Sequence, residues 1–374
     1  MKDKWLVFNT GFALFAMFFG SGNLVFPLAV GQDSEGHYLL AAFGILLTGV
    51  FVPFLGAFGM MLHEGSIHSF FKSFGRIGIF WFSLFALALM GPFGVLARCL
   101  TVAHGAILLI LPFVSLPATS FVLCVVIYLL TINKNKIVTI LGTWLTPFLL
   151  ICITMIAFFA LKQRPLPETS TTDLLQPLSN GFFQGYQTMD LLAAFFFSNF
   201  IIKQLKHVFS ASNQSAVINT FLKASLVGAA LLSIVYLFLV LLGCAYAPLL
   251  QNVPAQEKLG LIAIESLGSL AAPCVCGAIV LACLTTAIAL TSLFADFLRK
   301  EVCQNKLGKT PALLATLAIG FFVSTFDFSG ISKFLGPILE TIYPVLILFT
   351  LGNIAHKLWI NSGTVQKESR EGNR

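Results

Sequence analysis

The chain has 374 residues, of which 57% are hydrophobic and only 10% are charged. A soluble domain carries about a quarter of its residues as charged ones, so this composition excludes an ordinary water-soluble protein and indicates a chain surrounded by membrane lipid. The net charge of +7 does not indicate a nucleic-acid partner, because Lys and Arg are scattered over short polar breaks instead of forming a patch.

Ten apolar runs follow one another along the sequence, each near the ~20 residues that cross a hydrocarbon core as a helix. The third run is long and contains Gly91-Pro92, where we expect strong tilt or a bend. The predicted spans are 5–30, 37–62, 76–110, 118–132 and 137–161 in the first half, and 181–202, 219–247, 268–298, 311–328 and 334–356 in the second.

The ten spans divide into two sets of five around a polar connector rich in Pro, Ser and Thr at 162–180. We expect a first repeat at 1–161, a second at 181–358 and a tail at 359–374. Because an odd number of spans precedes the connector, the second set enters the bilayer from the opposite side. The sequence therefore predicts an all-α, polytopic membrane protein built as a five-plus-five inverted repeat.

Basic residues set the expected orientation, because Lys and Arg concentrate on the cytoplasmic side of a membrane protein. With the N-terminus inside, 17 of the 22 Lys and Arg fall in cytoplasmic segments. The external segments hold only Lys162, Arg164, Lys258 and Lys333, while Arg98 falls within the third span. Both termini are therefore expected on the cytoplasmic side.

The leading span of each half contains helix-breaking residues, which are GSGN at 20–23 in the first span and Gly181 with GYQT at 185–188 in the sixth. Gly costs roughly 1 kcal/mol in a helix interior, and opened backbone in lipid needs a cavity or a ligand. Half-helix ends attract a carboxylate at exposed amides and a cation at exposed carbonyls. Gly and Ser also permit close helix packing, but two breaks in equivalent positions favour a binding site and discontinuous first and sixth helices.

Arg98, Asp190 and Glu340 lie within predicted spans, where an ionised group costs about 2.5–3.5 kcal/mol unless it is paired or hydrated. Asp190 either pairs with Arg98 to lock two spans or serves as a cation or proton relay. An intramembrane enzyme using Ser21, His104 or Asp190 is disfavoured, since the sequence clusters no nucleophile with a base. A passive channel is the third alternative, because broken helices also line pores.

The eighth span places the Ala282 carbonyl and the hydroxyls of Thr285 and Thr286 within about one helical turn. Oxygen ligands of this kind suit a hard cation. A Thr in a membrane helix usually bonds its own backbone, so spacing alone favours a structural role. Seven cysteines within or beside apolar runs are interpreted as packing residues, not as disulfide or metal ligands: Cys99, Cys124, Cys152, Cys244, Cys274, Cys276 and Cys283.

The sequence resembles the branched-chain amino acid transport system II carriers, bacterial cation-coupled permeases for leucine, isoleucine and valine. The likeness lies in FALFAMFFGSGNLVFPLAVG at 12–31, GPFGVLAR at 91–98, GFFQGYQTMDLLAAFFF at 181–197 and LACLTTAIALTSLFADF at 281–297, with weaker support from LGPILETIYPV at 335–345.

That resemblance implies the leucine-transporter fold and symport in the bacterial cytoplasmic membrane, with sodium favoured over a proton, no cofactor and a branched-chain or other small apolar amino acid as substrate. The substrate would lie against Gly20, Ser21, Gly22, Asn23, Met90, Gly91, Tyr186, Gln187 and Thr188. The coupling ion would lie among Ala16, Phe19, Ala282, Thr285 and Thr286.

Overall fold

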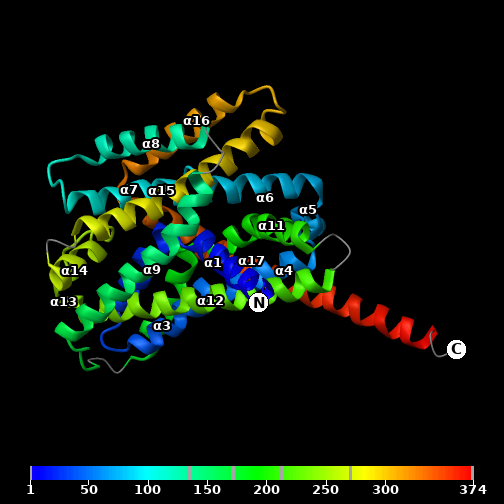
Figure 1. The fold of residues 1–374 in the computed structure, drawn as a ribbon, viewed down its shortest axis with the longest axis horizontal. Coiled ribbons are helices and arrows are strands. Elements are labelled where there is room, and N and C mark those ends of the chain that lie inside the picture. Colours follow the sequence, from blue (N-terminus) through cyan, green and yellow to red (C-terminus); the bar gives the residue numbers. More distant parts are fainter. Residues whose placement is uncertain (1, 133–136, 170–172, 210–213, 269–271, 372–374) are drawn as a thin grey trace.

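The computed structural model describes residues 2–132, 137–169, 173–209, 214–268 and 272–371, and these residues form helices and connecting turns without a strand. Figure 1 shows long helices lying side by side, with the C-terminal part of the last helix projecting beyond the bundle. The prediction of an all-α fold is confirmed.

The first half contains nine α-helices within the described residues. They are α1 (Lys2–Phe18), α2 (Ser21–Gln32), α3 (Tyr38–Leu46), α4 (Val52–Leu62), α5 (Ile67–Phe70), α6 (Gly75–Met90), α7 (Val95–Leu108), α8 (Leu116–Ile132) and α9 (Ile137–Gln163).

The second half contains eight α-helices within the same described part of the chain. They are α10 (Leu175–Gln187), α11 (Asp190–Phe209), α12 (Gln214–Ala245), α13 (Ala247–Leu250), α14 (Lys258–Leu267), α15 (Ala272–Phe297), α16 (Lys309–Ser324) and α17 (Asp327–Glu371).

Each of the ten predicted spans corresponds to a helix or a helix pair. Within the part of the chain that the structure describes, five helical segments are long and apolar enough to cross a membrane alone: Tyr38–Leu62, Lys72–Leu108, Gln214–Ala245, Pro273–Val302 and Asp327–Trp359. The pair α1 and α2 forms a sixth span, bent by 75°. The fourth, fifth and ninth predicted spans are shorter apolar helices, and the sixth is the pair α10 and α11.

Several boundaries differ from the predictions. Helix α10 begins at Leu175, inside the expected connector, and α17 continues to Glu371, far beyond the predicted end of the last span. The long third span is interrupted between Met90 and Val95, as the Gly91-Pro92 pair suggested. The end of a helix depends on capping and on neighbouring elements, and the apolar composition of the sequence predicts neither of them.

The helices pack in two groups. In the first group, α12 runs along α1 and α2, α10 packs on α3, and α11 packs on α4. In the second group, α15 runs along α7, and α16 lies beside α8, as Figure 1 shows at the edge of the bundle. The two broken spans therefore belong to one packing group, together with the second and seventh spans.

Glycines within α10 explain its close fit against α3. A β-carbon at Gly181 would lie 2.2 Å from the Ala41 carbonyl oxygen, and one at Gly185 would lie 2.0 Å from Oγ1 of Thr48. Of the predicted GYQT segment, Gln187 and Thr188 do lie where α10 ends, whereas the prediction that Gly181 and Gly185 interrupt the sixth span is wrong, because both glycines lie inside the helix. They serve the alternative role of letting two helices approach closely.

Candidate functional site

The first break lies between α1 and α2. The amide of Phe19 closes the last turn of α1 on the Phe15 carbonyl at 2.8 Å, and Gly20 is then extended, with φ −127° and ψ −164°. Asn23 stabilises this extended conformation, because its Oδ1 accepts a hydrogen bond from the Gly20 N–H at 2.8 Å. Carbonyls at the end of α1 and amides at the start of α2 are thereby released from helical pairing, as expected from GSGN.

The second break lies between α10 and α11. Thr188 donates its hydroxyl to the Gly185 carbonyl at 2.9 Å, and Met189 has φ +61°, a left-handed conformation that is unusual for this residue type. Helix α11 then begins at Asp190. A β-carbon at Gly22 would lie only 3.4 Å from Cα of Thr188, so the two breaks are in contact.

A buried polar cluster joins the two breaks. The Asn23 amide donates to Oδ2 of Asp190 and to the Tyr236 hydroxyl, both at 2.6 Å. Tyr236 of α12 donates to the same carboxylate oxygen at 3.3 Å. The exposed fractions of Asn23, Asp190 and Tyr236 are 1%, 3% and 0%. This Asn23–Asp190–Tyr236 cluster holds a carboxylate with neutral donors at the junction of three helices.

The sequence suggested an ion pair between Arg98 and Asp190 as one alternative, and the structure does not form it. Arg98, which is 1% exposed, donates Nη1 to the Gln187 carbonyl at 2.7 Å and Nη2 to Oε1 of Gln187 at 2.8 Å. Its guanidinium also lies 5.0 Å from the ring centre of Phe26 and 5.6 Å from that of Phe328. A cation here complements the negative end of α10, so Arg98 fixes the position at which this helix stops.

The residues expected to hold the coupling ion come from two elements that meet. Thr286 of α15 donates its hydroxyl to the Phe19 carbonyl at 3.4 Å, across the first break. Thr285 bonds the Ala282 carbonyl of its own helix at 2.9 Å. Ala16 lies in the last turn of α1. The released carbonyls and the two hydroxyls form an all-oxygen set of the kind that a hard cation prefers.

Met90 and Gly91, two residues of the predicted substrate site, lie at the end of α6. Met90 is buried at the end of α6, and a β-carbon at Gly91 would lie 3.2 Å from Cβ of Phe294. Gly91 therefore faces α15 at the end of α6. Tyr186 is buried near the second break, where its ring lies 4.9 Å from that of Tyr343 and forms an apolar wall.

The residues of the enzyme alternative have separate partners. Ser21 accepts a hydrogen bond from Sγ of Cys99 at 3.4 Å. His104 contacts Oγ1 of Thr119 at 3.0 Å, and Asp190 belongs to the cluster described above. No Ser-His-Asp constellation is therefore assembled from these three candidates.

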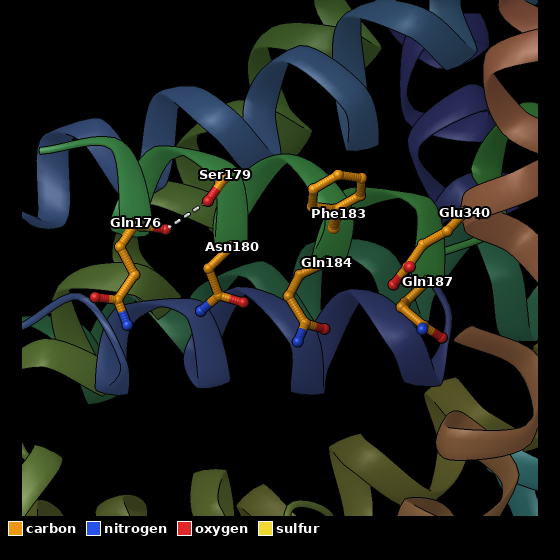
Figure 2. Close-up of a pocket in the computed structure, with 7 residues that line it drawn as sticks. All are labelled: Gln176, Ser179, Asn180, Phe183, Gln184, Gln187 and Glu340. Carbon is orange, nitrogen blue, oxygen red and sulfur yellow. Dashed lines mark hydrogen bonds between the residues drawn. The ribbon is translucent and has the colours of Figure 1, made fainter. Parts of the chain in front are cut away.

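Glu340 lines a cavity of about 360 Å³ that runs along one face of α10. Figure 2 shows the side chains of Gln176, Asn180, Gln184 and Gln187 pointing the same way from α10, with the Glu340 carboxylate directed toward Gln187. Gln187 is the last residue of α10, so this cavity ends at the second break.

Tyr236 and Cys99 were absent from the predicted site although both contact it. Tyr236 lies in the long apolar helix α12, where an aromatic residue is ordinary. A buried tyrosine hydroxyl nevertheless needs a partner, and that requirement was the only available signal. The apolar surroundings of Cys99 in the sequence predict a packing residue. Within the described residues all eight cysteines are free, and Cys274 is exposed while the six other predicted packing cysteines are buried.

Two relatives match nearly the whole of this chain and about four fifths of their own length. It is 28% identical to the branched-chain amino acid permease BrnQ of Corynebacterium glutamicum, over 92% of this chain and 80% of the relative. It is 29% identical to the branched-chain amino acid permease BraB of Bacillus subtilis, over 99% of this chain and 82% of the relative.

A solved structure described as the inward facing conformation of Mhp1 matches 93% of this chain and 76% of its own, with a TM-score of 0.58 and 12% identity. That likeness concerns the fold, and it agrees with a repeated architecture whose first and sixth helices are discontinuous. The sequence profile described as branched-chain amino acid transport protein matches residues 3–369. The chain therefore belongs to the branched-chain amino acid transport protein family, a family of multi-pass membrane transporters and not of enzymes.

Proposed function

We propose that this protein is a sodium-coupled symporter that imports leucine, isoleucine and valine through the bacterial cytoplasmic membrane by alternating access. The observation that carries the proposal is the contact of two helix breaks through the Asn23–Asp190–Tyr236 cluster, beside the Thr286 contact with Phe19. Backbone groups freed at such breaks bind a zwitterion and its cation. The relatives named above are permeases for branched-chain amino acids, which supports this substrate class.

The packing groups suggest how the site alternates between the two sides. The group of α1, α2, α3, α4, α10, α11 and α12 contains both breaks, and the group of α7, α8, α15 and α16 packs against it. Rocking of one group against the other would expose the site first outside and then inside. Lys and Arg are in excess in the segments that lie on the same side of the membrane as the two termini, which supports a cytoplasmic position for both termini.

Uptake into proteoliposomes tests the proposal. Labelled leucine, isoleucine or valine should accumulate inside when a sodium gradient is imposed, and a proton gradient alone should give little accumulation. Uptake driven by a proton gradient would identify the proton, in place of sodium, as the coupling ion. Equilibration without accumulation would identify a passive channel, and absence of gradient-dependent uptake of all three amino acids would refute the proposal.

The ion site has its own test. Thr286→Val removes the hydroxyl that reaches the Phe19 carbonyl, and Thr285→Val removes the neighbouring oxygen. Each variant should raise the sodium concentration for half-maximal uptake by about tenfold, the effect of losing roughly 1.4 kcal/mol of binding free energy. Thr316→Val is the matched control, because Thr316 is buried in α16 and bonds only its own helix at Ala312. A sodium titration that is the same in all four proteins would remove both threonines from the site.

A further inference from the structure

A groove between α9 and α12 shares no lining residue with either helix break. Its volume is about 340 Å³. The two helices pack against each other, and Figure 1 shows them side by side. The lining residues of α9 are spaced along one face of its C-terminal part, as helical periodicity requires. The groove is lined by Thr154, Ala157, Phe158, Leu161, Lys162 and Phe238.

The groove is apolar over most of its length. The Phe158 side chain is 56% exposed, and the hydroxyl of Thr154 is already bonded to the Leu150 carbonyl of its own helix at 2.7 Å. Because α9 forms the fifth predicted span, exposed apolar surface of this kind faces lipid hydrocarbon. A soluble polar ligand would find few hydrogen-bond partners along this part of the groove.

Lys162 supplies the polar end of the groove. It lies in the last turn of α9, where a lysine ordinarily complements the helix dipole and extends into water. Its ammonium group instead lies 4.6 Å from the ring centre of Phe158, one turn back along the helix. Within the described residues no carboxylate pairs with it, whereas the nearby Arg164 pairs with Glu265 at 3.5 Å. A positive charge without a protein counter-ion therefore lies at the mouth of an apolar groove.

An anionic phospholipid carries its charge and its hydrocarbon in the matching order. We propose that the groove binds such a lipid from the leaflet in which Lys162 lies, with the negatively charged headgroup on the Lys162 ammonium and one acyl chain between Leu161 and Phe238. Phe238 follows Tyr236 by two positions, so the lipid packs on a different face of α12 from the Asn23–Asp190–Tyr236 cluster. The bound lipid thereby holds α9 against the helix that supplies Tyr236 to the cluster.

Photolabelling from within the bilayer tests the site. The full chain is placed in phosphatidylcholine nanodiscs that contain a trace of either phosphatidylglycerol or phosphatidylcholine with a photoreactive group in one acyl chain. Mass spectrometry should find adducts at 154–161 and at Phe238, about fivefold more with the anionic lipid, because one lysine near an anionic lipid surface contributes about 1 kcal/mol. Equal labelling by the two lipids would overturn the proposal.

Variants of Lys162 show whether its charge causes this preference. Lys162→Gln should label equally with both lipids, and Lys162→Arg should keep the preference because the charge is retained. Lys333→Gln is the control and should also keep it, since Lys333 is an exposed lysine of α17 outside the groove lining. A preference that survives in Lys162→Gln would contradict the assigned headgroup contact.

Thermal unfolding in detergent provides a second readout. Added phosphatidylglycerol should raise the melting temperature of the unmodified protein more than added phosphatidylcholine does, and Lys162→Gln should abolish this difference. The same difference in both proteins would refute the site, and equal melting temperatures without added lipid would show that the variant folds correctly. Neither measurement involves transport, so both outcomes are independent of the proposed symport.

Discussion

At the residue scale, Asp190 combines burial with neutral hydrogen-bond partners. Two donors from α2 and α12 meet the same oxygen atom, so one carboxyl group joins three helices. Breaking this contact would separate the two broken spans. A ligand bound at the proposed site between the breaks would therefore respond to the relative position of α2 and α11.

Replacing the carboxylate tests this role. Asp190→Asn keeps the shape but replaces an acceptor oxygen by an NH2 group, and it should lower the initial rate of leucine uptake by more than about tenfold, because a buried donor left without a partner costs about 1–3 kcal/mol. Tyr236→Phe should have a smaller effect, since Asn23 still donates to Asp190. Thermal unfolding in detergent serves as the control for correct folding. Equal uptake by Asp190→Asn and the unmodified protein would show that the cluster is only structural.

The individual site residues could be predicted only in part from the sequence. Asp190 and Arg98 were visible because charges are rare in apolar spans. Their pairing with Gln187 and Tyr236 was not visible, because it depends on how α7, α10 and α12 pack. Asn23 was predicted from the break, but its contact with Asp190 spans 167 positions of sequence.

At the element scale, the two breaks arise from different local causes. Gly20 opens the first span because its backbone adopts an extended conformation beside Asn23. The sixth span opens at Met189, where Arg98, from another helix, binds the end of α10. The first cause is local and was readable from GSGN. The second cause is a contact with another helix, which the sequence does not show. For that reason Gly181 and Gly185, which serve packing, were predicted to be part of the break.

The packing role of these glycines is directly testable. Gly185→Ala would place a methyl group 2.0 Å from Oγ1 of Thr48, whose hydroxyl already bonds the Phe182 carbonyl at 2.7 Å. Overpacking of this kind destabilises by about 1–3 kcal/mol, so the melting temperature in detergent should fall. Gly277→Ala in α15 is the control, because nothing lies within 4 Å of its new β-carbon. Equal melting temperatures for the two variants would contradict the close fit of α10 on α3.

At the scale of the whole molecule, α14 connects the two packing groups, because it contacts α2 of the first group and α15 of the second. It is held to α9 by the Gln163 bond to the Ser266 carbonyl at 2.8 Å and by the Arg164 pair with Glu265 at 3.5 Å. It also reaches the end of α2, where Lys258 contacts Gln32 at 2.5 Å. Burial raises the pKa of Asp33 and lowers the pKa of Lys258, so water is partly excluded from this contact.

The contact between α14 and α2 must open if α2 belongs to a group that rocks. Joining Gln32→Cys to Lys258→Cys with a short, reducible bifunctional thiol reagent should therefore stop leucine uptake, and reduction should restore it. The same reagent applied to Arg164→Cys with Glu265→Cys joins α14 to α9 and should leave uptake unchanged, because neither partner lies on a broken span. Uptake that continues through a complete Gln32–Lys258 cross-link would mean that α2 and α14 move together. The boundary between the moving groups would then have to lie elsewhere, on the far side of α14 at its contact with α9.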